Sequence, residues 1–286
     1  MKTIKRAGVV IKPHAPGVER VLAELASYLE GRGIVALFET QAAEKLGRLP
    51  ASGTGLPREE IPAASDLVIV LGGDGTLLSV AHAAARRQVP VLGVNLGSLG
   101  FLTEVPIPEM TLTLDALLGG RDDLLSPRMV LEVAWSGGTD LVLNDAVINK
   151  GAKARMIEMG LAVNGNDVAS LRADGLIVAT PTGSTAYSLS AGGPIIQPRV
   201  PAIVLTPICP HTLTFRPCVI SSESTVRVEL LTKGERVFLT LDGQRGGRMA
   251  DGEVVTVSRA EVTLDLVSSP QRRYFGLLRE KLGWAE

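Results

Sequence analysis

A strand and a glycine-rich turn follow one another in the stretch Leu67-Val68-Ile69-Val70-Leu71-Gly72-Gly73-Asp74-Gly75-Thr76. Five consecutive apolar residues, most of them branched, predict a strand buried on both faces. The glycines allow a positive φ and let a ligand approach the amides closely, and free N–H groups beside a helix start form an anion site. The carboxylate of Asp74 therefore stands where phosphate would bind, as expected of a proton acceptor or a metal-linked group. An ordinary βα turn of a doubly wound sheet is the alternative.

Length and composition indicate a globular chain. Its 286 residues are enough for one large domain or two ordinary ones, and 45% hydrophobic against 21% charged residues argue against disorder. A net charge of −1 argues against nucleic-acid binding, and no apolar run reaches the ~20 residues of a membrane span. The basic N-terminus precedes an apolar stretch only a strand long, which argues against a signal peptide. Two cysteines suggest reduced thiols in a cytoplasmic protein, and three scattered histidines suggest no metal site.

Strands and helices alternate over roughly the first 125 residues, which predicts a parallel α/β domain. Strands are expected at 7–11, 34–38, 67–71 and 91–95, helices at 18–29 and 77–87, and a surface loop at 47–62. A second glycine-rich loop, at 96–103, follows the strand 91–95. Ligands of open α/β sheets bind outside such carboxyl ends.

The pattern changes after Pro127 to strand-like runs separated by short turns. These runs are 130–135, 141–148, 157–163, 168–172, 203–205, 226–230, 237–241, 254–257 and 262–267, with turns at Asn164-Gly165 (type I′) and Lys233-Gly234. They predict a β-rich sandwich of two sheets. We therefore expect a first domain at 1–126, a second at 127–269 and a short helix within about 270–286. The sequence leaves open whether that helix packs back on the first domain.

A second dense stretch runs from Arg172 to Pro194, where a strand enters a turn of small hydroxyl residues and a helix begins near Thr185. Hydroxyls and amides at a helix start bind ribose hydroxyls, amides or phosphates, although plain N-capping would explain the same residues. Tyr187 is a candidate for stacking on a base or for the core.

Two shorter stretches are also candidates. Asn144-Asp145 lies within a strand-like run, so at least one of the pair should face something polar, unless the strand simply ends there. Asp242-Gly243-Gln244 is typical of a hairpin turn.

Taken together, these stretches resemble the NAD kinases, which phosphorylate the 2′-hydroxyl of the adenosine ribose of NAD. The resemblance covers about residue 7 to the C-terminus and rests on Gly72 to Thr76, Asn95 to Thr103, Leu143-Asn144-Asp145, Asp174 to Pro194 and Asp242-Gly243-Gln244. The Gly-Gly-Asp-Gly turn is shared with phosphofructokinases and diacylglycerol kinases, whereas 174–194 is highly specific. The resemblance implies a Rossmann-like N-terminal α/β domain, a β-rich C-terminal domain, and a dimer or tetramer.

The resemblance also implies roles for single residues. Asp74 matches the catalytic aspartate and general base. Asn144 and Asp145 match an Asn-Glu pair that holds the nicotinamide-side ribose or the metal-bound phosphates, here with a side chain one methylene shorter. The other nucleotide-binding positions are Gly72, Gly73, Gly75, Thr76, Phe101, Arg155, Arg172, Asp174, Thr185, Ala186, Tyr187, Ser188, Leu189, Ser190, Cys209 and Gln244. The implied substrates are NAD and ATP with Mg²⁺ or another divalent cation, and no side chain is assigned as a metal ligand.

Three hypotheses follow from the sequence. The chain is an NAD kinase, a lipid or sugar kinase that shares the glycine-rich turn, or a non-catalytic dinucleotide-binding module. A Walker-type site is excluded by motif, because the sequence has no Gly-x-x-x-x-Gly-Lys-Ser/Thr. A dehydrogenase is disfavoured because no Gly-x-Gly-x-x-Gly follows the first strand.

Overall fold

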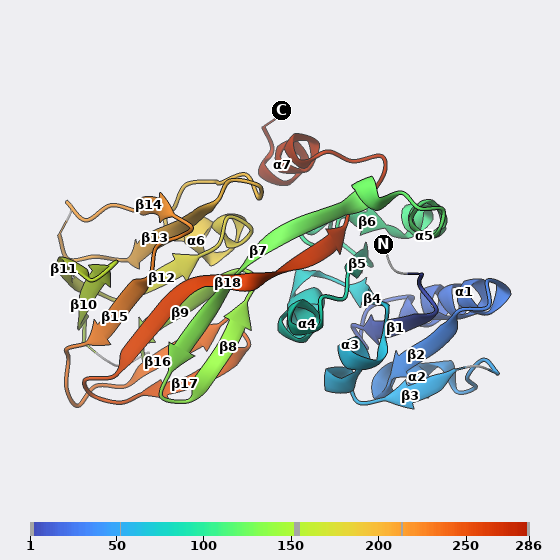
Figure 1. Cartoon of the computed structure of the whole chain (residues 1–286), viewed down its shortest axis with the longest axis horizontal. Helices are drawn as coiled ribbons and strands as arrows, with labels where there is room; N and C mark the ends of the chain where they lie inside the picture. The colour runs from blue at the N-terminus through green and yellow to red at the C-terminus, as the bar shows by residue number, and fades with distance from the viewer. Residues whose placement is uncertain (1–2, 52, 152–154, 213, 285–286) are drawn as a thin grey trace. The chain divides into compact units, whose positions relative to one another are not determined.

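The structure is a computed structural model that describes residues 3–51, 53–151, 155–212 and 214–284. The chain divides into two compact units, which Figure 1 shows with their elements. The first unit comprises residues 1–127 and 264–286, and the second unit comprises residues 128–263. Among the described helices, none is long and apolar enough to cross a membrane.

The first unit is built on a parallel sheet. Its strands in spatial order are β3 (Thr54–Leu56), β2 (Val35–Glu39), β1 (Arg6–Ile11), β4 (Leu67–Gly72), β5 (Val91–Asn95) and the C-terminal end of β18 (Val254–Val267), and β6 (Val105–Pro106) also pairs with β5. This is the strand order of a Rossmann fold, with the order reversing between β1 and β4. Every residue of β4 is buried, as the apolar run predicted. The expected Rossmann-like α/β region is confirmed.

Helices cover both faces of this sheet. Side chains of α1 (Val18–Gly31) and α5 (Met110–Leu118) join the core on the face that holds Val9, Ile69 and Val94. Successive strand residues face opposite sides, so Val68 and Val70 face the other layer, with α3 (Ile61–Ala64) and α4 (Asp74–Arg87). The unit is completed by α2 (Thr40–Leu46), α7 (Tyr274–Leu282), η1 (Arg58–Glu60), η2 (Ile107–Glu109) and η3 (Asp122–Leu124).

The second unit is a sandwich of two sheets, as the sequence predicted. One sheet is antiparallel and has the order β14 (Cys218–Ser221), β13 (Ala202–Ile208), β12 (Gly175–Ala179), β9 (Asp145–Lys150), β16 (Val237–Leu241) and β17 (Arg245–Met249). The other contains β11 (Asn166–Ala173), β10 (Ile157–Val163), β15 (Val226–Leu230) and the N-terminal part of β18, with β7 (Leu125–Trp135) and β8 (Gly138–Val142) beside it. Apolar residues of both sheets, such as Leu176 and Val228, form one core.

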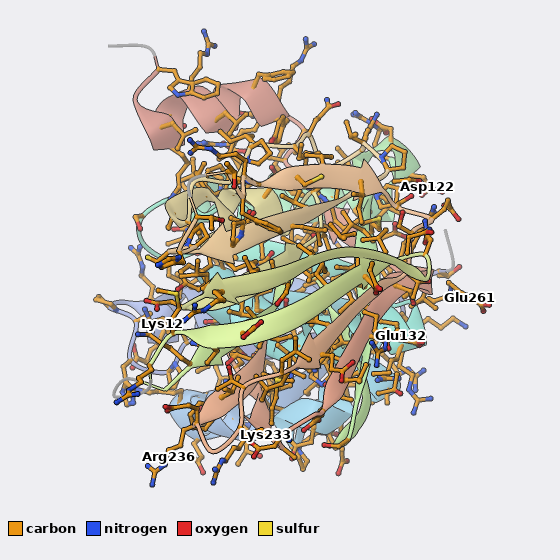
Figure 2. The ribbon with its side chains drawn as sticks, turned by 90° about the vertical axis from the view of Figure 1, so that its left-hand side faces the viewer. Lys12, Asp122, Glu132, Lys233, Arg236 and Glu261 are labelled. Atoms are coloured by element: carbon orange, nitrogen blue, oxygen red, sulfur yellow. The ribbon has the colours of Figure 1, made fainter. Side chains whose placement is uncertain are left out.

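Several local predictions are confirmed. The strands at 91–95, 157–163, 226–230 and 237–241 match β5, β10, β15 and β16. Asn164 and Gly165 have φ of 53° and 76°, as a type I′ turn requires. Gly234, with φ of 75°, lies in the predicted turn between β15 and β16, whose Lys233 and Arg236 are labelled in Figure 2.

Other local predictions are wrong. The run 141–148 is two strands, β8 and β9, because a distant carboxylate captures the backbone between them. The runs 254–257 and 262–267 are one strand, β18, whose first residues pair with β15 and whose last residues pair with β5. The loop at 47–62 contains β3, η1 and part of α3, since β3 adds to the edge of β2. By contrast, the helix predicted to begin near Thr185 is present, although it is short: η4 (Gly183–Thr185) is followed by the four-residue α6 (Tyr187–Ser190).

Candidate active site

The carboxylate of Asp74, the first residue of α4, lies in a cradle of hydrogen-bond donors. Its Oδ2 accepts the N–H of Phe101 at 2.8 Å, and its Oδ1 accepts the N–H groups of Leu102 and Thr103 at 3.1 and 2.9 Å and the hydroxyl of Thr103 at 2.9 Å. Three consecutive amides thus fix the orientation of the carboxylate. A carboxylate has about four lone-pair sites, so Oδ2 keeps one site for a further donor.

The glycines of both loops make room for this arrangement. A Cβ on Gly100 would overlap Oδ1 of Asp74 and the hydroxyl of Thr103. A Cβ on Gly72 would lie 2.7 Å from the Thr76 hydroxyl oxygen. Glycine is therefore required at 100, where the loop 96–103 meets Asp74, and at 72, where the turn folds closely against its own Thr76.

The loop that carries these donors is itself anchored at two points. Asn95 accepts the N–H of Gly97 at 2.7 Å and donates to the carbonyl of Ser98 at 2.7 Å. Lys281 of α7 donates to the carbonyl of Leu99 at 2.5 Å, and its ammonium lies 5.4 Å from the centroid of the Phe101 ring. The C-terminal helix thus belongs to the surroundings of Asp74, a role that no local sequence pattern indicated.

A separate pocket of about 330 Å³ lies within the second unit. It is lined by four predicted residues, Asn144, Asp145, Ala186 and Tyr187, and by Val147, Asn149, Thr240, Asp242 and Gly243. Among the described residues, Asn144 Oδ1 and Asn149 Oδ1 are buried without a hydrogen-bond partner. Two unsatisfied amide oxygens in one pocket favour a ligand that brings N–H or O–H donors.

The side chain of Asp242 explains why the strand-like run 141–148 is interrupted between β8 and β9, next to this pocket. Its buried carboxylate accepts the N–H groups of Leu143 at 2.9 Å, Asn144 at 2.7 Å and Asp145 at 3.2 Å. The backbone carbonyl of Leu143, in the same interrupted segment, accepts a hydrogen bond from the hydroxyl of Thr180 at 2.6 Å. Asp242 itself has φ of 49° in the tight β16–β17 turn, so the predicted hairpin turn is present and its side chain also shapes the pocket.

Two carboxyl groups therefore share a buried site. Burial, followed by the charge of Asp242, raises the pKa of Asp145 to about 7. Burial also raises the pKa of Asp242, although its three backbone N–H donors and the Arg245 guanidinium oppose that rise. Near neutral pH, Asp145 exchanges between a hydroxyl donor and a charged acceptor.

Replacing Asp145 by Asn is expected to stabilise the protein at pH 8 but not at pH 4. Between its ordinary value of 3.8 and about 7, the folded state holds a proton that the unfolded state has lost, so folding stability falls as pH rises through that window. Asparagine does not ionise and avoids a cost of up to ~4 kcal/mol at pH 8. Calorimetric unfolding at both pH values measures this difference. Asp167→Asn, at an exposed position of the same unit, is the control, and parallel pH profiles for Asp145→Asn and wild type would refute the effect.

The remaining predicted residues do not line this pocket. Asp174, between β11 and β12, pairs with Lys150 at 3.1 Å, and the Ser188 hydroxyl is buried against that of Thr206 at 2.8 Å. Cys209 is exposed and has φ of 44°. Arg155, Arg172, Thr185, Leu189, Ser190 and Gln244 lie outside the lining as well. No group of three or more His, Cys, Asp or Glu side chains within the described ranges is arranged to hold a metal ion.

Sequence reasoning missed several residues of these sites. Asn149 and Thr240 reach the pocket through the pairing of β9 with β16, and the register of two strands far apart in the chain is not visible locally. Asp242 was predicted as part of a hairpin turn and of the family resemblance, but not as a residue whose side chain shapes the pocket.

A glycine-rich turn at the switch point of a Rossmann-like sheet, with an oriented carboxylate, defines a nucleotide-dependent phosphotransferase. Residues 7–121 match the family model of the ATP-NAD kinase N-terminal domain, and residues 143–269 match that of the ATP-NAD kinase C-terminal domain. The chain belongs to the ATP-NAD kinase family. The resemblance inferred from the sequence, and the expectation of an ATP-dependent NAD kinase, are confirmed.

Individual relatives agree with this assignment. The chain is 48% identical to the NAD kinase of Geobacter metallireducens and 47% identical to that of Trichlorobacter lovleyi, over 99% of this chain and 100% of each relative. It superposes on yeast NADH kinase in complex with NADH with a TM-score of 0.90 and 27% identity, covering 100% of this chain and 89% of the yeast chain. It superposes on an Archaeoglobus fulgidus NAD kinase in complex with ATP with a TM-score of 0.76 and 28% identity, covering 96% and 98% of the two chains.

Proposed function

We propose that the protein transfers the terminal phosphoryl group of ATP to the 2′-hydroxyl of the adenosine ribose of NAD, forming NADP, with Asp74 as general base. The observation that carries this proposal is the cradle of Asp74 beside the glycine-rich turn. The family assignment supports the same reaction.

The proposed chemistry assigns separate tasks to the turn and to the carboxylate. A ribose hydroxyl is a poor nucleophile until its proton is removed as the bond to phosphorus forms. Oδ2 of Asp74 has one free acceptor position for that proton, while the donors from 101–103 hold the carboxylate in place. The bond from phosphorus to the bridging oxygen of ATP breaks and ADP leaves. Amides of the turn from Gly72 to Thr76 bind the phosphate oxygens, apart from that of Thr76, which donates to the Gly73 carbonyl at 2.9 Å.

The pocket of the second unit is the proposed site for NAD. Asn144 and Asn149 offer acceptor oxygens for N–H or O–H donors, and Asp145 offers a carboxyl group for a ribose hydroxyl. The ring of Tyr187, 45% exposed, is available to stack on a base.

An assay of NADP formation by the purified chain, with donor and acceptor varied, tests the reaction. We expect turnover with ATP and NAD and none with lipid or sugar acceptors. Turnover of a lipid or sugar would support the second hypothesis from the sequence, and NAD binding without turnover would support the third.

Four further features are proposed with this function. Mg²⁺ enters bound to the phosphates of ATP, as it does in most kinase sites, and is part of the substrate. Residues 1–126 carry the phosphate-binding turn and residues 127–269 bind NAD.

The chain forms a homodimer or homotetramer, as the family resemblance implies. A cytoplasmic location is supported by the two free, exposed thiols of Cys209 and Cys218.

Replacing Asp174 by Ala is expected to raise the KM for NAD by ~10- to 150-fold and to leave the KM for ATP nearly unchanged, because a hydrogen bond to a charged group contributes ~1.5–3 kcal/mol. Steady-state kinetics with each substrate varied measures both constants. Equal loss for both substrates would indicate a folding role, and no loss would remove Asp174 from the site.

The ion pair with Lys150 provides the matched control. Lys150→Met removes the 3.1 Å pair but leaves the Asp174 carboxylate in place. If Asp174 contacts NAD, this variant keeps most of its NAD affinity. A loss as large as that of Asp174→Ala would show that the pair, and not the contact with NAD, is what matters.

A further inference from the structure

A second polar pocket lies in the first unit, at the carboxyl ends of β2 and β3. Its volume is about 350 Å³, within the range of small-ligand sites. Its lining comprises Glu39, Thr40, Gln41, Pro57, Arg58 and Glu59. Glu39 ends β2, and Pro57 follows the last residue of β3. None of the functional residues predicted from the sequence is in this lining.

The guanidinium of Arg58 is held rigidly at this pocket. It donates to the Glu39 carboxylate at 2.5 and 3.0 Å, to the carbonyl of Ile11 at 3.1 Å and to the hydroxyl of Ser79 at 3.2 Å. Glu39 is only 2% exposed, whereas 31% of the Arg58 side chain is exposed. A planar guanidinium that is fixed in this way and remains partly exposed to solvent is a surface on which a purine base can stack.

The same contacts connect the pocket to the glycine-rich turn. Ser79, which accepts from Arg58, donates to the carbonyl of Thr76 at 2.7 Å. In the strand order, β1 lies between β2 and β4, so the end of β2 and the turn after β4 are two strand spacings apart. Two spacings amount to ~10 Å, which a nucleotide can span from its base to its terminal phosphates.

Lys12 occupies the position between the pocket and the turn. It follows β1, and its N–H donates to the carbonyl of Leu71 at 2.8 Å. A Cβ on Gly72 would lie 3.2 Å from the Cβ of Lys12, so the lysine stem begins against the turn. Its side chain is exposed and labelled in Figure 2, and a flexible ammonium at this place suits a phosphate chain.

We propose that this pocket binds the nucleoside part of the phosphoryl donor, with the base on Arg58 and the phosphate chain passing Lys12 to the turn at Gly72 to Thr76. The charges select this orientation: Glu39 neutralises Arg58 and Glu59 adds a negative charge, so the lining is net negative and disfavours phosphates more than a neutral nucleoside. The assignment rests on the proposed function in one respect, that the turn binds the phosphates of ATP.

Filling the pocket tests the proposal. Gln41 is exposed and lines the pocket, and Gln41→Trp is expected to raise the KM for ATP by ~5- to 150-fold, the effect of losing one stacked base. The KM for NAD should not change, nor should inhibition by inorganic tripolyphosphate, which has no nucleoside. Glu44→Trp, on the same helix but outside the pocket, is the control and should behave as wild type. An unchanged KM for ATP in Gln41→Trp, with NADP still formed, would overturn the donor site but not the kinase.

A second measurement needs no variant. Photolysis of the full chain with 8-azido-ATP and saturating NAD should label peptides within residues 39–59, as read by mass spectrometry. Labelling confined to other peptides would place the base elsewhere and overturn the proposal.

Discussion

Replacing Asp74 by Asn is expected to lower kcat by at least ~10²-fold, the lower limit for losing a general base. Asparagine keeps the size of the side chain but does not take up the ribose proton. Its amide NH₂ would also face N–H donors, either that of Phe101 or those of Leu102 and Thr103. We therefore expect the loop 101–103 to shift slightly while NAD affinity stays close to that of wild type.

A variant that disturbs only the cradle separates these two effects. Thr103→Val removes the hydroxyl that donates to Oδ1 at 2.9 Å but keeps the carboxylate and all three amides. It should lose much less activity than Asp74→Asn, because the carboxylate that accepts the ribose proton is still present. Near wild-type turnover in pure Asp74→Asn would exclude the general base. Equal losses in the two variants would assign the effect to loop position.

Replacing Asp242 by Ala is expected to destabilise the second unit by about 3 kcal/mol or more, because three buried N–H groups lose their acceptor at ~1–3 kcal/mol each. The break at 143–145 should open, so amide hydrogen exchange should accelerate at Leu143, Asn144 and Asp145. The KM for NAD should rise, because the break directs Asn144 and Asp145 into the pocket. Urea unfolding, exchange mass spectrometry and kinetics measure the three effects.

Asp242→Asn is the graded control. Its carbonyl oxygen still accepts from two of the three amides, and its neutral side chain removes one cause of the raised pKa of Asp145. We expect a smaller loss of stability than in Asp242→Ala, with a lower pKa at Asp145. If the alanine variant unfolds at the wild-type urea concentration and keeps slow exchange at 143–145, the carboxylate does not organise this segment.

The sequence alone determined the features that depend on neighbours in the chain. The apolar run 67–71 predicted the central strand because branched side chains pack well on both faces of a parallel sheet. Asn164-Gly165 predicted a type I′ turn because both residues tolerate a positive φ. The glycine-rich turn with Asp74 and the stretch 174–194 identified the family, which the matches to the two ATP-NAD kinase domain models confirm.

Only the tertiary structure decided the features that join distant parts of the chain. The break at Leu143 depends on a carboxylate 99 residues away, and the orientation of Asp74 depends on amides 27 to 29 residues away. Such side chain–backbone hydrogen bonds leave no trace in local periodicity, so 141–148 appeared to be one strand. In the same way, the pairing of β9 with β16 places Thr240 opposite Val147, two residues along β9 from Asn149, and all three line the pocket. Arg58 likewise joins the ends of β1 and β2 to α4. Apolar pattern and turn chemistry specify each element, whereas buried polar groups find partners only once the elements are packed.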